Sequence, residues 1–137
     1  MSINQIIKKY ESSPRKLFLI DGFGAILSSF LLGVVLVKFE RYIGIPASTL
    51  YLLASLPIFF ASYDFYCFRK KNANYGALLK GISIINFLYC FLSIGFSFYH
   101  LETITATGWA YILIEVLIVM FIATIEFKVA KKLIAKK

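Results

Sequence analysis

Residues 108–127 read GWAYILIEVLIVMFIATIEF, a stretch without lysine or arginine whose only charged side chains are Glu115 and Glu126. An α-helix rises about 1.5 Å per residue, so a stretch of this length crosses the roughly 30 Å hydrocarbon core of a bilayer. Basic residues follow at once, beginning with Lys128. A long apolar helix that ends in a basic segment is typical of a membrane span and its cytoplasmic flank.

Three further apolar runs of similar length precede it, at residues 17–37, 46–68 and 77–99. Short connections join successive runs, and such connections place neighbouring helices antiparallel. The sequence therefore predicts an all-α integral membrane protein: one domain, a four-helix bundle running up-down-up-down. The apolar residues of segment 1–13 fall on one helical face beside lysines, which predicts a short helix on the membrane surface.

The high proportion of hydrophobic residues also indicates a protein that lies in a lipid bilayer. Of the 137 residues, 60% are hydrophobic, and the mean hydropathy is +0.79. A soluble domain of this size has too much surface to bury so many apolar side chains. The net charge is +8, but the basic residues flank apolar runs, so we expect anionic lipid headgroups as partners and no nucleic acid. Cys67 and Cys90 should lie at different depths, too far apart for a disulfide.

The distribution of basic residues predicts the orientation. If the four runs alternate in direction, thirteen of the fifteen lysines and arginines lie on one side, and only Lys38 and Arg41 lie on the other. The positive-inside rule makes the basic side cytoplasmic. We therefore expect a cell (inner) membrane with both termini on its cytoplasmic side. The thirteen are Lys8, Lys9, Arg15, Lys16, Arg69, Lys70, Lys71, Lys80, Lys128, Lys131, Lys132, Lys136 and Lys137.

Polar residues within the third run recur at steps of three or four, which places them on one face of a helix. They are Lys80, Ser83, Asn86, Cys90, Ser93, Ser97 and His100. Such a stripe lines either a helix–helix contact or a polar pathway, and both interpretations stay open. No second ligand accompanies His100 at metal-binding spacing, so we expect no metal site there and a hydrogen bond to Glu102 instead.

Glu115 lies near mid-membrane and shares a helical face with Glu126, which lies near the inner edge. A carboxyl group at the centre of a span is costly unless it has a partner, so it is a functional candidate. Asn86 should lie at the depth of Glu115 and hydrogen-bond to it across the two helices.

A second set of ionisable residues lies near the expected cytoplasmic boundary, one from each span. They are Asp21, Asp64, Lys80 and Glu126. Because charges at a common depth in a low dielectric interact strongly, we expect a charge network in which Lys80, or Arg15 or Arg69 in its place, pairs with Asp21 and Asp64. Such a network would fix the order of the helices, or it would bind a cation or an anionic lipid headgroup between them. In the first run, Ala25, Ser29 and Gly33 form a row of small residues that predicts a close helix contact in a homo-oligomer.

No nucleotide-binding loop, zinc-binding motif or nucleophile elbow occurs, so no catalytic residue, metal or cofactor is predicted. Three functions remain. The chain is a small transporter or channel-like subunit that uses Glu115, or an accessory subunit whose polar contacts assemble a membrane complex, or a membrane enzyme acting on lipid or quinone. Access to Glu115 separates the first two, because a transporter must expose this carboxyl group and an assembly protein must cover it.

Overall fold

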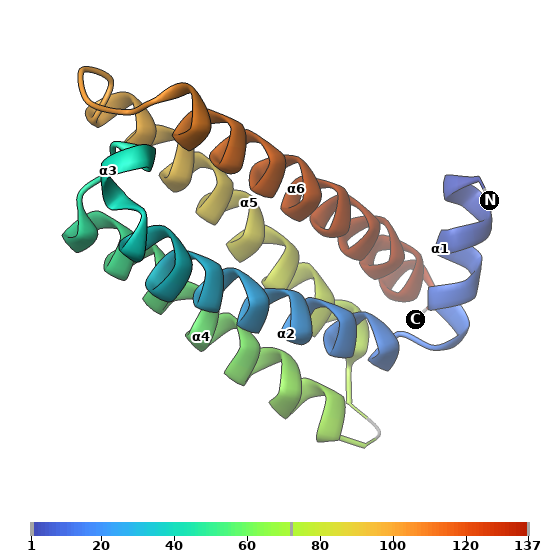
Figure 1. Ribbon diagram of the computed structural model, residues 1–137. Coiled ribbons are helices and arrows are strands. Elements are labelled where there is room, and N and C mark those ends of the chain that lie inside the picture. Colours follow the sequence, from blue (N-terminus) through green and yellow to red (C-terminus); the bar gives the residue numbers. More distant parts are fainter. Residues whose placement is uncertain (1, 72, 137) are drawn as a thin grey trace.

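A computed structural model describes residues 2–71 and 73–136. All secondary-structure elements in these residues are helices. Four segments are long and apolar enough to cross a membrane, and Figure 1 shows them side by side in alternating directions. They are Arg15–Leu36, Ala47–Arg69 (α4), Tyr75–Tyr99 (α5) and Ala106–Ala135 (α6). The predicted all-α four-helix bundle is therefore confirmed.

Two of the segments differ from simple apolar runs. The first is an α-helix, α2 (Arg15–Phe30), continued by a wider π-helical segment, η1 (Leu31–Leu36). The last, α6, continues to Ala135, well past the predicted end at residue 127. The extension is rich in lysine and alanine, which favour helix, so the helix does not end where the hydrophobic stretch ends.

The N-terminal helix, α1 (Ile3–Ser12), begins with a capping box in which Ser2 and Gln5 each accept the other's backbone N–H. Ile7 is buried, and α1 packs against the end of α6, where Lys136 Nζ lies 2.5 Å from Glu11 Oε1. The hydrogen bond from Lys136 lowers the pKa of Glu11 below its ordinary value. Placement of α1 on a membrane surface stays a prediction.

At the opposite end, the short helix α3 (Glu40–Ile43) turns the chain into α4. Gly44 follows it with φ +80°, and the backbone of Thr103 occupies the space that a β-carbon would need. Only glycine meets both requirements without strain. Thr105 Oγ1 also donates to Ile43 O at 3.1 Å, which ties α3 to the start of α6.

The bundle consists of two tightly packed pairs, α2 with α4 and α5 with α6. The pairs meet mainly through α4 and α5, whereas α2 and α6 scarcely touch. Within the first pair, Ser29 Oγ donates to Ala54 O at 2.7 Å, and a β-carbon at Gly33 would lie 3.1 Å from Ala54 Cβ. These two small residues pack on α4 of the same chain, so they give no support to the expected contact between copies.

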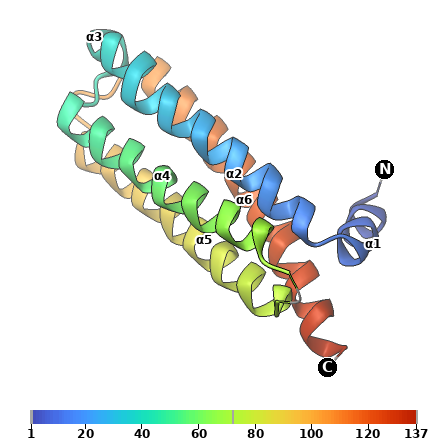
Figure 2. The same ribbon diagram turned by 90° about the horizontal axis from the view of Figure 1, so that it is seen from below.

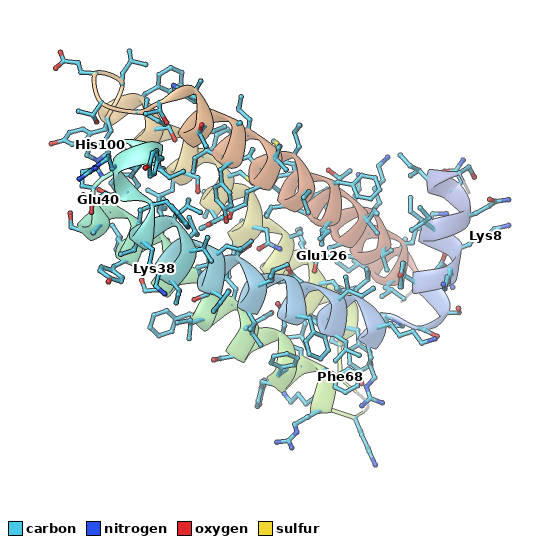
Figure 3. The ribbon with its side chains drawn as sticks, viewed as in Figure 1. Lys8, Lys38, Glu40, Phe68, His100 and Glu126 are labelled. Atoms are coloured by element: carbon cyan, nitrogen blue, oxygen red, sulfur yellow. The ribbon has the colours of Figure 1, made fainter. Side chains whose placement is uncertain are left out.

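Both termini lie at one end of the bundle, and α3 lies at the other (Figures 1 and 2). Lys8 and Lys38 accordingly lie at opposite ends in Figure 3, whereas Glu126 lies inside the bundle. The alternation on which the charge count depends is thus present. Which end faces the cytoplasm stays a prediction.

Candidate cation and ligand sites

Each of the four spans contributes one polar side chain to a cluster inside the bundle: Asp21 from α2, Asp64 from α4, Asn86 from α5 and Glu126 from α6. We call these four residues the carboxyl cluster. Asn86 Nδ2 donates to Asp21 Oδ2 and to Glu126 Oε1, each at 3.0 Å. One oxygen from each of the three carboxyl groups lies within 4.8 Å of the others.

The cluster is shielded from solvent, and no positively charged side chain of the described residues belongs to it. Asp64 and Glu126 are 0% exposed, and among the described residues both oxygens of Asp64 and Oε2 of Glu126 have no hydrogen-bond partner. Lys80, expected to neutralise the network, is exposed and forms no ion pair in the described part of the chain. The uncharged amide of Asn86, and not Lys80, contacts the carboxyl groups. A buried carboxylate without a counter-charge costs several kcal/mol, so this cluster needs protons or a cation.

Local packing explains why these side chains meet. A β-carbon at Gly22 would lie 3.0 Å from the ring of Phe65 and 3.4 Å from Asp64 Cβ, so the glycine lets α4 approach α2 beside Asp21. Two apolar clusters fill the bundle, one containing Phe18 and the other containing Leu32. Along the first span, Asp21 lies between Phe18 on α2 and Leu32 on η1, so apolar packing on both sides holds the polar side chains in place.

Glu115 lies in a separate polar site that sequence reasoning placed incorrectly. Its Oε1 accepts a hydrogen bond of 2.6 Å from Tyr89 OH, and its Oε2 accepts one of 2.7 Å from Tyr111 OH. The expected bond from Asn86 is wrong, because Asn86 donates to Asp21 and Glu126. Tyr111 lies four residues before Glu115 on the same helix face, a spacing that could have indicated the contact. The partner on α5, Tyr89, had no such signal.

The polar stripe on α5 faces the interior, since Ser83, Ser93 and Ser97 are each 0% exposed. Ser83 and Ser97 bond back to carbonyl groups of their own helix, at 2.8 and 2.9 Å. Ser93 Oγ has no partner among the described residues. At the end of the stripe, His100 Nε2 lies 3.0 Å from Thr49 Oγ1, so Thr49 takes the place expected for Glu102.

A cavity of about 230 Å³ lies where α2 and α6 diverge, and it joins the two polar sites. Asp21 and Asn86 lie on its wall, and so do Glu115, Tyr89 and Tyr111. Apart from Ser28, the rest of the lining is apolar, and it comes from the first, second and fourth spans. It includes Gly24, Ala25, Leu27, Ser28, Leu31, Pro57, Phe60, Ile114, Ile118, Val119 and Ile122. Leu27, Ile114 and Ile118 are more than half exposed, which places the mouth of the cavity on the outer face of the bundle.

The fold and these sites define the class of the protein: a multi-pass helical membrane protein with carboxyl groups buried between its spans. No family model, no curated protein and no solved structure matches the chain. Function must therefore be inferred from the chemistry of the two polar sites and of the cavity between them.

Proposed function

We propose that the protein is a small membrane carrier that takes hydrophobic organic cations from the bilayer into the cavity between α2 and α6. One observation carries the proposal: a largely apolar cavity opens on the lipid-facing surface and has the carboxyl group of Glu115 on its wall. Ligand sites are typically concave and mostly apolar, with a few polar groups that fix orientation.

The charge of the lining selects the class of ligand. Among the residues that the structure describes, Asp21 and Glu115 are the only carboxyl groups on its wall, and no lysine, arginine or histidine lines the cavity. An anion would meet no counter-charge there, whereas a cation would pair with Glu115. The rings of Tyr89, Tyr111 and Phe60 add aromatic surface, which attracts cations by their π electrons.

The two tyrosines preorganise Glu115 for this role. Each carboxyl oxygen of Glu115 accepts one hydrogen bond from a phenol O–H group, so the side chain has a fixed position before a ligand arrives. A carboxylate oxygen has a second lone pair, which leaves capacity for a cation. Glu115 is only 7% exposed, but it lies on the cavity wall. That remaining access supports the carrier over an accessory subunit, whose polar residues would be covered completely by packing.

The test uses benzyltrimethylammonium, which combines an apolar ring with a permanent positive charge. Equilibrium dialysis against the purified protein in mild detergent measures its binding. We expect saturable binding that Glu115→Gln weakens about tenfold or more, since two opposite unit charges about 4 Å apart attract by about 4 kcal/mol at an effective dielectric constant of about 20, from which the desolvation of the cation is subtracted. The matched control is Glu102→Gln, which changes an exposed carboxyl group outside the cavity.

A second measurement separates charge from hydrophobicity. Neopentylbenzene has the same shape without the charge, so it should compete poorly with the cation. Uptake of the labelled cation into proteoliposomes then tests transport itself. Equal binding by the parent protein and Glu115→Gln, or equal competition by the neutral compound, contradicts the proposal and leaves the accessory role as the better explanation.

A further inference from the structure

We propose that the carboxyl cluster is a binding site for a hard divalent metal cation, held by Asp21, Asp64 and Glu126. This site differs from the cavity ligand site and does not depend on the carrier function. The sequence placed the three residues at a common depth but could not show that their carboxyl oxygens meet, because each comes from a different span.

The distances fit a shared ion. Oxygen ligands surround Mg²⁺ at about 2.1 Å and Ca²⁺ at about 2.4 Å, so opposite ligands lie about 4.2–4.8 Å apart and adjacent ones lie closer. In the cluster, one oxygen of each carboxyl group lies within 4.8 Å of the other two. Three carboxylate oxygens without nitrogen or sulfur ligands are the set preferred by magnesium, calcium and manganese.

The unpartnered oxygens point to the same ligand. A 0% exposed carboxyl group normally has hydrogen bonds, yet neither oxygen of Asp64 has a partner among the described residues. Glu126 Oε2 is in the same situation. Both side chains nevertheless direct an oxygen toward Asp21 and toward each other. Buried carboxyl groups are neutralised by protons, by a basic partner or by a metal ion. Among the described residues no basic side chain pairs with these three, so protons occupy the cluster when it holds no metal ion.

Charge balance favours a divalent over a monovalent ion. Three ionised carboxyl groups carry three negative charges, of which a divalent ion compensates two. The amide of Asn86 partly offsets the one remaining negative charge, because its two N–H groups donate to Asp21 and Glu126. Asn86 thus orients two ligands from the second coordination shell, a role that commonly changes metal affinity about 10–100-fold. Asp21 also lines the cavity, which gives an ion a path to the cluster.

The experiment uses Mn²⁺ as the probe, because free Mn²⁺ is counted directly by electron paramagnetic resonance. The full chain, purified in mild detergent and freed of metal with EDTA, is titrated in about 150 mM NaCl, a physiological ionic strength. We expect one Mn²⁺ per chain, displaced by Mg²⁺ or Ca²⁺. Asp64→Asn should weaken binding by at least the tenfold that loss of an outer-shell partner causes.

Glu115→Gln is the matched control, because it removes a buried carboxyl group of α6 outside the cluster and should leave Mn²⁺ binding unchanged. A melting experiment guards against misfolding: Mn²⁺ should raise the melting temperature of the parent protein and of Glu115→Gln, but not that of Asp64→Asn. Absence of Mn²⁺ binding by the parent protein in NaCl overturns the proposal, and so does equal binding by Asp64→Asn. Neither result bears on benzyltrimethylammonium binding at Glu115.

Discussion

Asp64→Asn should stabilise the metal-free protein, although it alters a completely buried residue. Two unit charges at the 4.8 Å limit of the cluster repel by about 3.5 kcal/mol at an effective dielectric constant of about 20. Asp64 has two such neighbours, Asp21 and Glu126, so full ionisation would cost about twice that amount. The asparagine amide has nearly the same shape, removes both repulsions and can donate to the remaining carboxylates.

Protons bound to the cluster relieve part of this repulsion in the parent protein, which limits the gain. Replacement of buried ionic groups is often stabilising by about 1–4 kcal/mol, and we expect Asp64→Asn to fall in the lower half of that range. For a chain of this size, that corresponds to a rise in melting temperature of about 3 °C or more.

The assay is thermal unfolding followed by circular dichroism in detergent with EDTA. Glu115→Gln serves as the comparison, because both oxygens of Glu115 have partners and its replacement should lower the melting temperature. Opposite signs for the two variants are the expected result. A lower melting temperature for Asp64→Asn in EDTA would refute the charge-repulsion reasoning, since it would mean that Asp64 makes favourable contacts.

Three further predictions concern other contacts. Tyr89→Phe should cost about 1–3 kcal/mol in thermal unfolding, because it leaves one oxygen of the buried Glu115 without a donor; an unchanged melting temperature would contradict that hydrogen bond. Lys80→Ala should change stability by less than about 0.5 kcal/mol, because Lys80 is exposed and pairs with no described carboxylate; a loss of several kcal/mol would restore it to the network. The pKa of Glu11 is lowered by Lys136, so this contact should hold α1 on α6 above the ordinary carboxyl pKa of about 4.3 and release it as pH falls through the lower folded value. A spin label at the exposed Asn4→Cys, which leaves the Ser2 cap intact, should therefore gain mobility at acid pH, whereas in Glu11→Gln it should be mobile at every pH.

The fold was predictable from sequence because membrane spans are set by length and hydrophobicity, which are local properties. The carboxyl cluster was predictable only in part. Counting residues from each membrane boundary placed Asp21, Asp64 and Glu126 at a common depth. The same count could not show which side chain of α5 contacts these carboxyl groups, because that depends on how the helix is rotated about its axis. In the structure α5 is rotated so that Asn86 donates to Asp21 and Glu126, whereas Lys80 is exposed on the surface.

The cavity lay beyond sequence reasoning for a different reason. It exists because α2 packs on α4 and α5 packs on α6 while α2 and α6 diverge, and no periodicity in a single helix encodes that choice of partners. The small residues of the first span illustrate the limit. Ser29 and Gly33 indicated a close helix contact, but the contacting helix is α4 of the same chain.

The account depends most on the claim that the chain crosses a membrane four times with both termini on the cytoplasmic side, because the buried carboxyl groups and the lipid-facing cavity take their meaning from it. Single cysteines at Ser2 and at the exposed Glu102, in a chain with Cys67→Ala and Cys90→Ala, test this claim with a membrane-impermeant maleimide on intact cells. We predict labelling of Glu102→Cys in intact cells and of Ser2→Cys only after permeabilisation. Labelling of both positions from the same side would contradict the account.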